Sequence, residues 1–144
     1  MSRRVATILI GLLLSIAATA SAQEAELGKV LDRLAAAWAR ADAATLAALS
    51  ARNGVSIDVD GEPIGPLSPR QAAAVLRNIF VGRSTDTLSK GLVRIVGGQP
   101  PRAFGELSWT VRTQGTSIPE KTKVFLALVW EGNAWRITQI RLLR

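Results

Sequence analysis

The sequence predicts a single-domain α+β fold in which N-terminal helices pack on the concave face of a strongly bent, mainly antiparallel, cone-like sheet. Three observations predict it. Helical periodicity is confined to the first part of the chain, and strand-like alternation dominates the rest. Residues 124–130 are apolar on both faces, as in a strand inside a sheet. The apolar positions of the last strand change phase near Thr138, which is typical of a bulge that bends a sheet.

The first 22 residues are expected to be a signal peptide, and residues 23–144 the mature domain. Arg3 and Arg4 precede an apolar segment, and Ala20-Ser21-Ala22 is a small-x-small cleavage site. The apolar segment, residues 5–18, is shorter than the roughly 20 residues of a bilayer-spanning helix, so an uncleaved membrane anchor is the less favoured alternative. We expect a periplasmic or secreted protein with no stable membrane anchor after cleavage.

The composition is basic and contains no cysteine. Eighteen Lys and Arg residues against 11 Asp and Glu residues give a net charge of +7, and loss of Arg3 and Arg4 with the signal peptide lowers it to +5. A basic balance favours anionic neighbours such as envelope polymers or lipid headgroups. Nucleic acid is not an expected partner, because no nucleic-acid motif or interleaved basic and aromatic patch is present. The absence of cysteine excludes disulfides, thiol chemistry and a lipidated cysteine.

Three helices are expected before the strands begin. Apolar residues at three- and four-residue spacing predict an amphipathic helix over residues 24–40. Asp42 is the expected N-cap of a shorter helix over residues 43–50. Ser68-Pro69-Arg70-Gln71 is a capping box with proline at the first helical position, and it predicts a helix that runs to about Phe80.

Strands make up most of the remaining chain. The alternation at residues 55–60 predicts a strand with one solvent-exposed face. Residues 62–67 contain proline and glycine, and they predict an irregular connecting segment or a short edge strand. Further strands are expected over residues 88–96 and 103–113. Residues 121–143 predict a long antiparallel hairpin with a tight turn at Gly132 and Asn133.

Four segments in this order resemble the nuclear-transport-factor-2-like superfamily, the cystatin-like α+β cone. They read AWARADAATLAAL, VSIDVDGE, SPRQAAAVLRNIF and NAWRITQIRLL, and the resemblance covers nearly all of residues 24–143. The combination of GPLSPRQAAAVLRNIF with VFLALVW and WRITQIRLL resembles, more narrowly, an uncharacterised family of short exported bacterial proteins. The resemblance implies back-to-back homodimerisation through the outer sheet face. It carries no catalytic motif over to this chain.

Carboxylates are the only plausible acid–base groups, because histidine, cysteine and tyrosine are absent. Asp58 and Asp60 share a strand face about 6.5–7 Å apart by strand rise. They are interpreted either as a proton-transferring carboxylate pair or, preferably, as a solvated face beside an Asp-Gly turn. Asp58 is the better catalytic candidate because it lies further from the turn. We expect no metal site and no cofactor, since no ligand motif is present.

Ligand-pocket candidates are Trp38, Asp58, Trp109 and Phe125. Trp38 and Trp109 are expected to face the space between the first helix and the sheet, where they either line an aromatic pocket or fill the core. Trp130 and Trp135 flank one turn and are expected to form a cross-strand pair.

The predicted function is an exported, non-catalytic binding domain with a helix–sheet cavity for a small apolar or amphipathic ligand or a protein segment. One alternative is an isomerase-, dehydratase- or hydrolase-type enzyme that uses Asp58. The other is a structural or interaction module that acts through the outer sheet face. Expected partners are a second copy of the chain, a small ligand or an envelope protein. A filled cavity below an apolar outer face would favour the interaction module.

Overall fold

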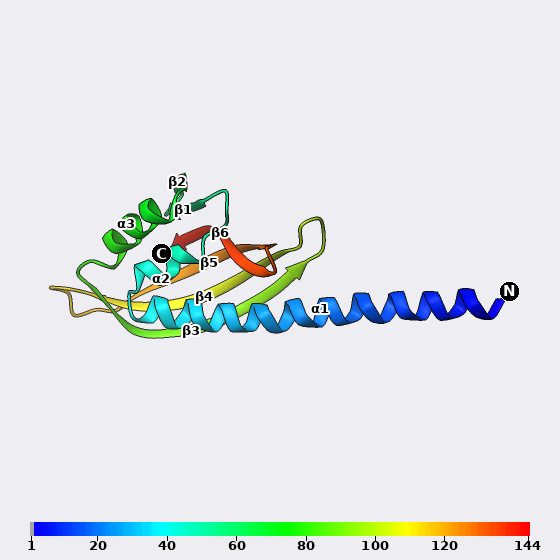
Figure 1. The fold of residues 1–144 in the computed structure, drawn as a ribbon. Coiled ribbons are helices and arrows are strands. Elements are labelled where there is room, and N and C mark those ends of the chain that lie inside the picture. The colour runs from blue at the N-terminus through cyan, green and yellow to red at the C-terminus, as the bar shows by residue number, and fades with distance from the viewer. Residues whose placement is uncertain (1) are drawn as a thin grey trace.

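Three helices and six strands form one α+β domain in the computed structural model, which describes residues 2–144 and the side chains of residues 19–144 (Figure 1). The elements are α1 (Ser2–Ala39), α2 (Ala43–Ala48), β1 (Val55–Val59), β2 (Glu62–Leu67), α3 (Pro69–Phe80), β3 (Arg83–Val96), β4 (Arg102–Thr113), β5 (Glu120–Glu131) and β6 (Ala134–Leu143). The predicted fold class is confirmed.

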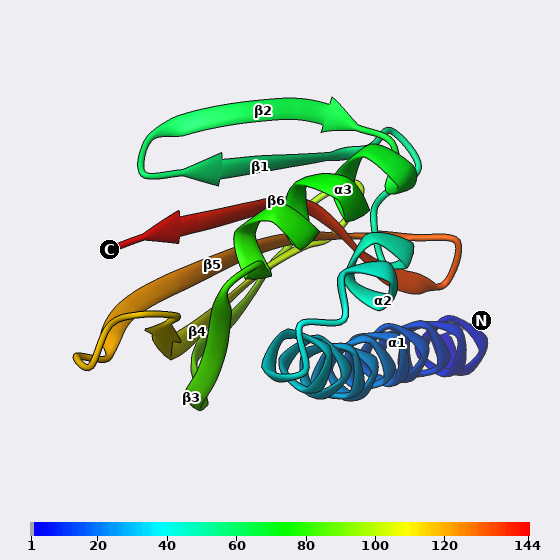
Figure 2. The same ribbon diagram turned by 90° about the vertical axis from the view of Figure 1, so that its left-hand side faces the viewer.

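The strands form one bent sheet in the order β2-β1-β6-β5-β4-β3. Neighbouring strands pair antiparallel except β1 and β6, which are parallel. The helices lie on the concave side of this sheet (Figure 2). The double-faced apolar strand β5 lies inside the sheet between β4 and β6, as predicted. Its inward residues Val124, Leu126 and Leu128 are buried, whereas Phe125 on its other face is exposed.

A bulge at Thr138 bends the closing hairpin where the phase change predicts it. Ala127 pairs with Gln139 but Leu128 pairs with Ile137, so Thr138 is the extra residue on β6. The Thr138 hydroxyl donates to the Ala127 carbonyl at 3.1 Å. Because of the extra residue, apolar side chains on both sides of the bulge reach the core: Trp135, Ile137, Ile140 and Leu142.

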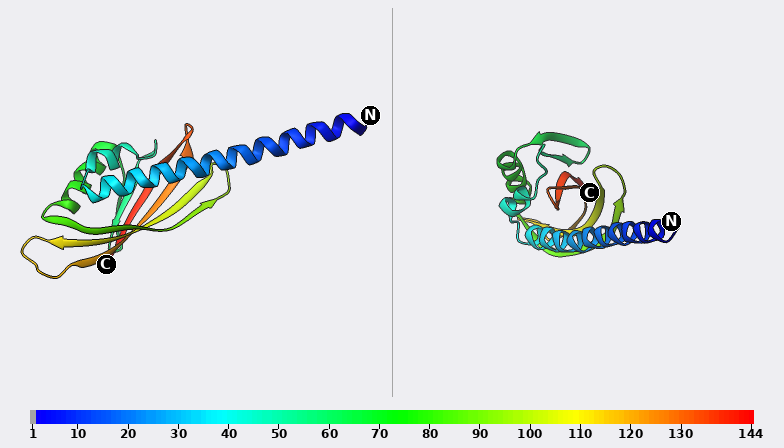
Figure 3. Two further views of the ribbon diagram at one scale, coloured as in Figure 1. Left: turned by 90° about the horizontal axis from the view of Figure 1, so that it is seen from below. Right: turned by 45° about the vertical axis from the view of Figure 1, so that its right-hand side comes forward.

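Helix α1 is continuous and lies across the strands at its C-terminal end, while its N-terminal half extends beyond the sheet (Figures 1 and 3). The predicted apolar stripe is confirmed, since Leu27, Leu31, Leu34 and Trp38 are buried. The predicted boundary after Ala22 falls within this helix, and the apolar segment of the expected signal peptide lies outside the residues with described side chains. Within the part of the chain that the structure describes, no helix is long and apolar enough to cross a membrane.

The predicted helix caps are confirmed. Ser68 and Gln71 each accept a hydrogen bond from the other's backbone N–H, which completes the capping box of α3. Asp42 caps α2: its carboxylate accepts the Thr45 backbone N–H at 3.0 Å and the Thr45 hydroxyl at 2.7 Å. The hydrogen bond from the Thr45 backbone, followed by that from its hydroxyl, holds the pKa of Asp42 below its usual value.

Several element boundaries differ from the sequence prediction: α1 begins at Ser2 instead of residue 24, and two further differences have a cause in the strand pairing. Helix α2 ends at Ala48 instead of residue 50, because Ser50 forms a parallel bridge with Ile137 of β6. Strand β3 begins at Arg83 instead of residue 88, because its polar first residues pair with the end of β4, with Arg83 opposite Thr113. The segment at residues 62–67 forms edge strand β2, one of the two predicted alternatives.

Candidate functional site

The space between the helices and the sheet contains a cluster of three aromatic rings. Trp38 of α1, Phe80 of α3 and Trp109 of β4 pack edge to face, with ring centroids 5.1–5.9 Å apart. All three are buried, and the Trp109 indole N–H donates to the Thr85 hydroxyl at 2.9 Å. Trp38 and Trp109 therefore face the space that the sequence predicts, and their rings occupy it as core.

The other two pocket candidates, Asp58 and Phe125, lie on the opposite face of the sheet. Ile57 points into the core, so strand alternation directs Asp58 outward. Asp58 accepts the Gly61 backbone N–H at 2.9 Å and forms an ion pair with Arg141 Nε at 3.2 Å. Arg141 is in turn opposite Phe125 in the sheet register. The expectation that one helix–sheet pocket contains all four candidates is therefore corrected.

Asp58 and Asp60 have separate arginine partners. Asp60 lies in the turn after β1 with a φ of 53°, and its carboxylate is 3.3 Å from Arg144 Nε. The two carboxylates are thus held by different arginines, but the interpretation of a solvated face fits Asp60 alone, because Asp58 is buried with an exposed fraction of 5%. Within the described residues, no three acidic side chains gather as a metal site would need. Trp130 and Trp135 form the predicted cross-strand pair, with centroids 5.3 Å apart.

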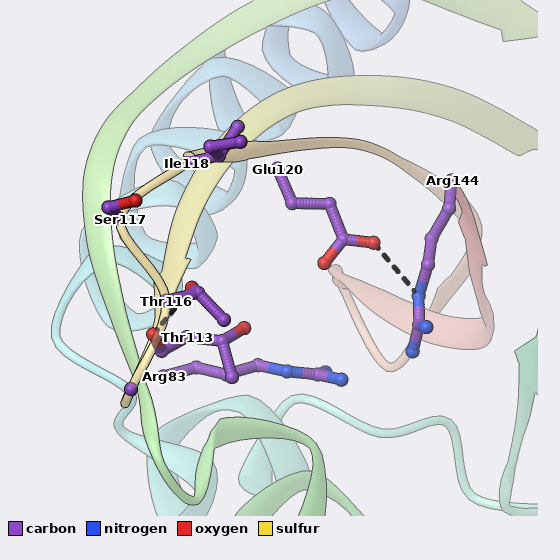
Figure 4. A pocket seen from close by; sticks show the side chains of 8 residues that line it. Arg83, Thr113, Thr116, Ser117, Ile118, Glu120 and Arg144 are labelled. Carbon is purple, nitrogen blue, oxygen red and sulfur yellow. Dashed lines mark hydrogen bonds and ion pairs between the residues drawn. The ribbon is translucent and has the colours of Figure 1, made fainter.

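A depression of about 610 Å³ opens at the end of the sheet that carries the β4–β5 loop (Figure 4). We call it the concave mouth, and its lining includes Arg83, Thr113, Thr116, Ser117, Ile118, Glu120 and Arg144. These residues come from the start of β3, the end of β4, the β4–β5 loop, the start of β5 and the residue after β6. Polar and charged side chains dominate, in contrast to the aromatic cluster.

Strand alternation explains why these side chains converge. On β4 the buried Val111 is followed on the same face by Thr113, and on β6 the buried Leu142 is followed by Arg144. Glu120 lies on the matching face of β5, two residues before the buried Thr122. The concave face therefore continues from the apolar core into polar side chains at the strand ends.

The two arginines of the concave mouth differ in their partners. Arg144 Nε is 3.5 Å from Glu120 and 3.3 Å from Asp60, so its charge is balanced by carboxylates. Arg83 Nη1 donates to the Ile79 carbonyl at 3.0 Å, and no acidic side chain among residues 19–144 is within ion-pair distance of it. The remaining guanidinium donors of Arg83 favour an anionic group at this place.

The sequence analysis did not identify Arg83, Glu120 or Arg144 as site residues. A signal was present, because the alternation of β4, β5 and β6 can be continued past the last apolar residue of each strand. That continuation predicts which polar side chains point to the concave side. It does not predict where helical cover ends, which decides whether those side chains border open space.

Comparison with known proteins supports the fold and leaves the activity open. No protein-family model and no curated protein matches the chain. A domain of unknown function with a cystatin-like fold from Nostoc punctiforme is 16% identical, with a TM-score of 0.66 over 85% of this chain and 77% of that one. A DUF4783 family protein from Bacteroides ovatus is 14% identical, with a TM-score of 0.62 over 76% and 90%. An NTF2-like protein from Cytophaga hutchinsonii is 8% identical, with a TM-score of 0.60 over 83% and 96%.

Proposed function

We propose that this chain, which has the nuclear-transport-factor-2-like, cystatin-like fold, is a non-catalytic domain that binds a small amphipathic molecule at its concave mouth. The observation that carries the proposal is the depression of about 610 Å³ where the concave face extends past the aromatic core. It combines a cation without an acidic partner, several hydroxyls and an exposed apolar side chain, which are the groups that an amphipathic ligand needs.

The lining of the concave mouth has a polar part and an apolar part. Thr113 and Thr116 lie near Arg83, and Ser117 lies further along the loop beside Ile118, as Figure 4 shows. The Thr116 hydroxyl donates to the Thr113 carbonyl at 2.7 Å, which orders the start of the loop. Ile118, whose exposed fraction is 80%, offers apolar surface on the same loop. We expect the anionic end of a ligand at Arg83 and its apolar part against Ile118.

The carboxylate geometry supports binding over proton transfer. The enzyme alternative requires Asp58 inside a cavity with convergent polar groups, and Asp58 instead lies on the outer side of the sheet with Arg141 and Gly61 as partners. The carboxylates near the concave mouth, Glu120 and Asp60, are both within ion-pair distance of Arg144 Nε. This arrangement is typical of a charge network that links strand ends, and it is unlike an acid–base pair.

Replacing Arg83 with glutamine is expected to weaken binding of octanoate, an eight-carbon amphipathic anion, by about tenfold. Loss of one charge-assisted hydrogen bond accounts for a change of this size, about 1.4 kcal/mol. Titration calorimetry on the wild-type chain and the Arg83→Gln variant measures it. Arg77→Gln, which removes an exposed arginine of α3 outside the concave mouth, is the matched control and should bind like wild type. Equal affinities for all three proteins would reject the proposal.

The proposed domain acts after export, with Gln23 as its first residue. The Gln23 carbonyl accepts a hydrogen bond from the Trp135 indole N–H at 2.8 Å, which fixes the backbone of Gln23 against the folded domain. The part of α1 that precedes Gln23 projects beyond the sheet (Figure 1). A protease could therefore reach the expected cleavage site without unfolding the sheet. Mass spectrometry of the protein from the producing cell should give a chain that starts at Gln23. A chain that retains residues 1–22 in the membrane fraction would contradict the export proposal.

A further inference from the structure

The side of the sheet away from the helices, which we call the outer face, exposes large apolar side chains. It is formed by the alternate residues of β1 and β3 to β6 that point away from the core. Leu92, Phe104 and Phe125 have exposed fractions of 82%, 48% and 37%. Leu92 lies in a register irregularity of β3 between Lys90 and Val93, which leaves it without a partner in the ladder. Exposed apolar surface of this kind is typical of an interaction site.

Phe125 lies between two depressions of the outer face. One, of about 470 Å³, has Lys121, Lys123 and Leu143 in its lining. The other, of about 490 Å³, has Leu92 and Phe104 in its lining. Both depressions include Phe125, so the surface offers two neighbouring hollows with an aromatic side chain between them.

Basic side chains surround this apolar centre. Those at outward positions include Arg94, Arg102, Arg112, Lys121, Lys123 and Arg141. Three have acidic partners, in the ion pairs Arg112–Asp86, Lys123–Glu106 and Arg141–Asp58. The other three have no acidic partner within the part of the chain whose side chains are described. The outer face thus carries three cations without an acidic partner around Phe104 and Phe125.

We infer that the outer face binds an acidic, partly apolar segment of another protein. Carboxylates of such a segment would complement the three unpaired cations, and its apolar side chains would enter the hollows on either side of Phe125. An aromatic centre with a charged rim is the usual anatomy of a protein interface. The outer face borders the concave mouth at Arg144, which lines a depression on each side, but the inference does not depend on the ligand proposed for the concave mouth.

Two other occupants fit the surface less well. A second copy, which the family resemblance implies, would place the same three unpaired cations against one another, and like charges in an interface are unfavourable. An anionic bilayer would satisfy the charge, but two distinct hollows match individual side chains better than a flat lipid surface. Both occupants are outcomes that the experiment below distinguishes.

The probe is a fluorescent 12-residue peptide of alternating glutamate and leucine, titrated with the full chain and followed by anisotropy. We expect binding that weakens as salt rises, because exposed charges are screened. The double variant Arg102→Glu, Lys121→Glu should weaken binding at least tenfold, and it breaks no ion pair of the folded protein. The control Arg70→Glu, Arg77→Glu makes the same charge change on exposed positions of α3 and should bind like wild type.

Further measurements test the contribution of the apolar side chains to peptide binding and distinguish the two other occupants. Leu92→Ser changes a side chain that is 82% exposed, so it should leave folding intact and weaken peptide binding several-fold. Equal binding by the two double variants would overturn the inference. It would also be overturned if only phosphatidylglycerol vesicles bound the outer face, or if sedimentation showed a dimer that Phe125→Ser dissociates. Arg83→Gln should leave peptide binding unchanged, so this test and the octanoate test can fail separately.

Discussion

Replacing Trp38 with alanine is expected to lower the free energy of unfolding by about 3–5 kcal/mol, because removal of a large buried ring leaves a cavity. Trp38 is fully buried, and its ring contacts Phe80 and Trp109 edge to face, so the variant loses packing between α1, α3 and β4 at once. Typical domains have only about 5–15 kcal/mol of stability, so the loss is large. Urea denaturation monitored by circular dichroism gives the value.

Two phenylalanine variants provide the controls. The Trp38 indole N–H has no hydrogen-bond partner among the described residues, so Trp38→Phe removes volume without breaking a hydrogen bond. Trp109→Phe also loses the hydrogen bond to Thr85, which should make it about 1 kcal/mol less stable than Trp38→Phe. A Trp38→Ala variant within 1 kcal/mol of wild type would show that the three rings do not fill the core. The predicted internal ligand cavity would then become the better hypothesis.

Inserting an alanine directly after Thr138 is expected to unfold much of the protein population at room temperature. The bulge accommodates one extra residue, so a second extra residue would turn Ile140 and Leu142 to the outer face whenever Trp135 and Ile137 remain inward. Exposing two buried aliphatic side chains costs about 3–6 kcal/mol by transfer free energy. The strand ladder between β6 and its neighbours must also rearrange. Near-ultraviolet circular dichroism of the tryptophans and a thermal melt would show the loss.

Thr138→Ala keeps the bulge and serves as the comparison. It removes only the hydrogen bond from the Thr138 hydroxyl to Ala127, which is worth about 1 kcal/mol. An insertion variant as stable as Thr138→Ala would mean that the inward orientation of Ile140 and Leu142 does not depend on a single extra residue at the bulge.

Local sequence signals were sufficient for most of the fold. The bulge at Thr138 is visible as a phase change in a two-residue alternation, and the cap of α3 is visible in the side chains of Ser68 and Gln71. The first residues of β3 carried no such signal. They are polar, and their extended conformation depends on pairing with β4, whose last residues are distant in sequence.

The candidate site was less predictable from sequence. Periodicity placed Trp38 and Trp109 toward the helix–sheet space, but it does not encode how rings from three elements pack there. Alternation with Ile57 already placed Asp58 on the other face of its strand. The location of the concave mouth depends on where the helices end relative to the strand ends. The alternation of residues along a strand contains no information about the helix ends, so it does not predict this site.

A nuclear magnetic resonance titration of the ¹⁵N-labelled chain with octanoate tests the central claim most directly, because it locates binding residue by residue. The proposed binding site predicts that amide shifts concentrate at the concave mouth, on Arg83, Thr113, Gly115, Thr116 and Ser117. Amides around Phe125 on the outer face should stay unchanged. Shifts centred on the outer face, or no shifts up to the solubility limit of octanoate, would contradict a binding site at the concave mouth.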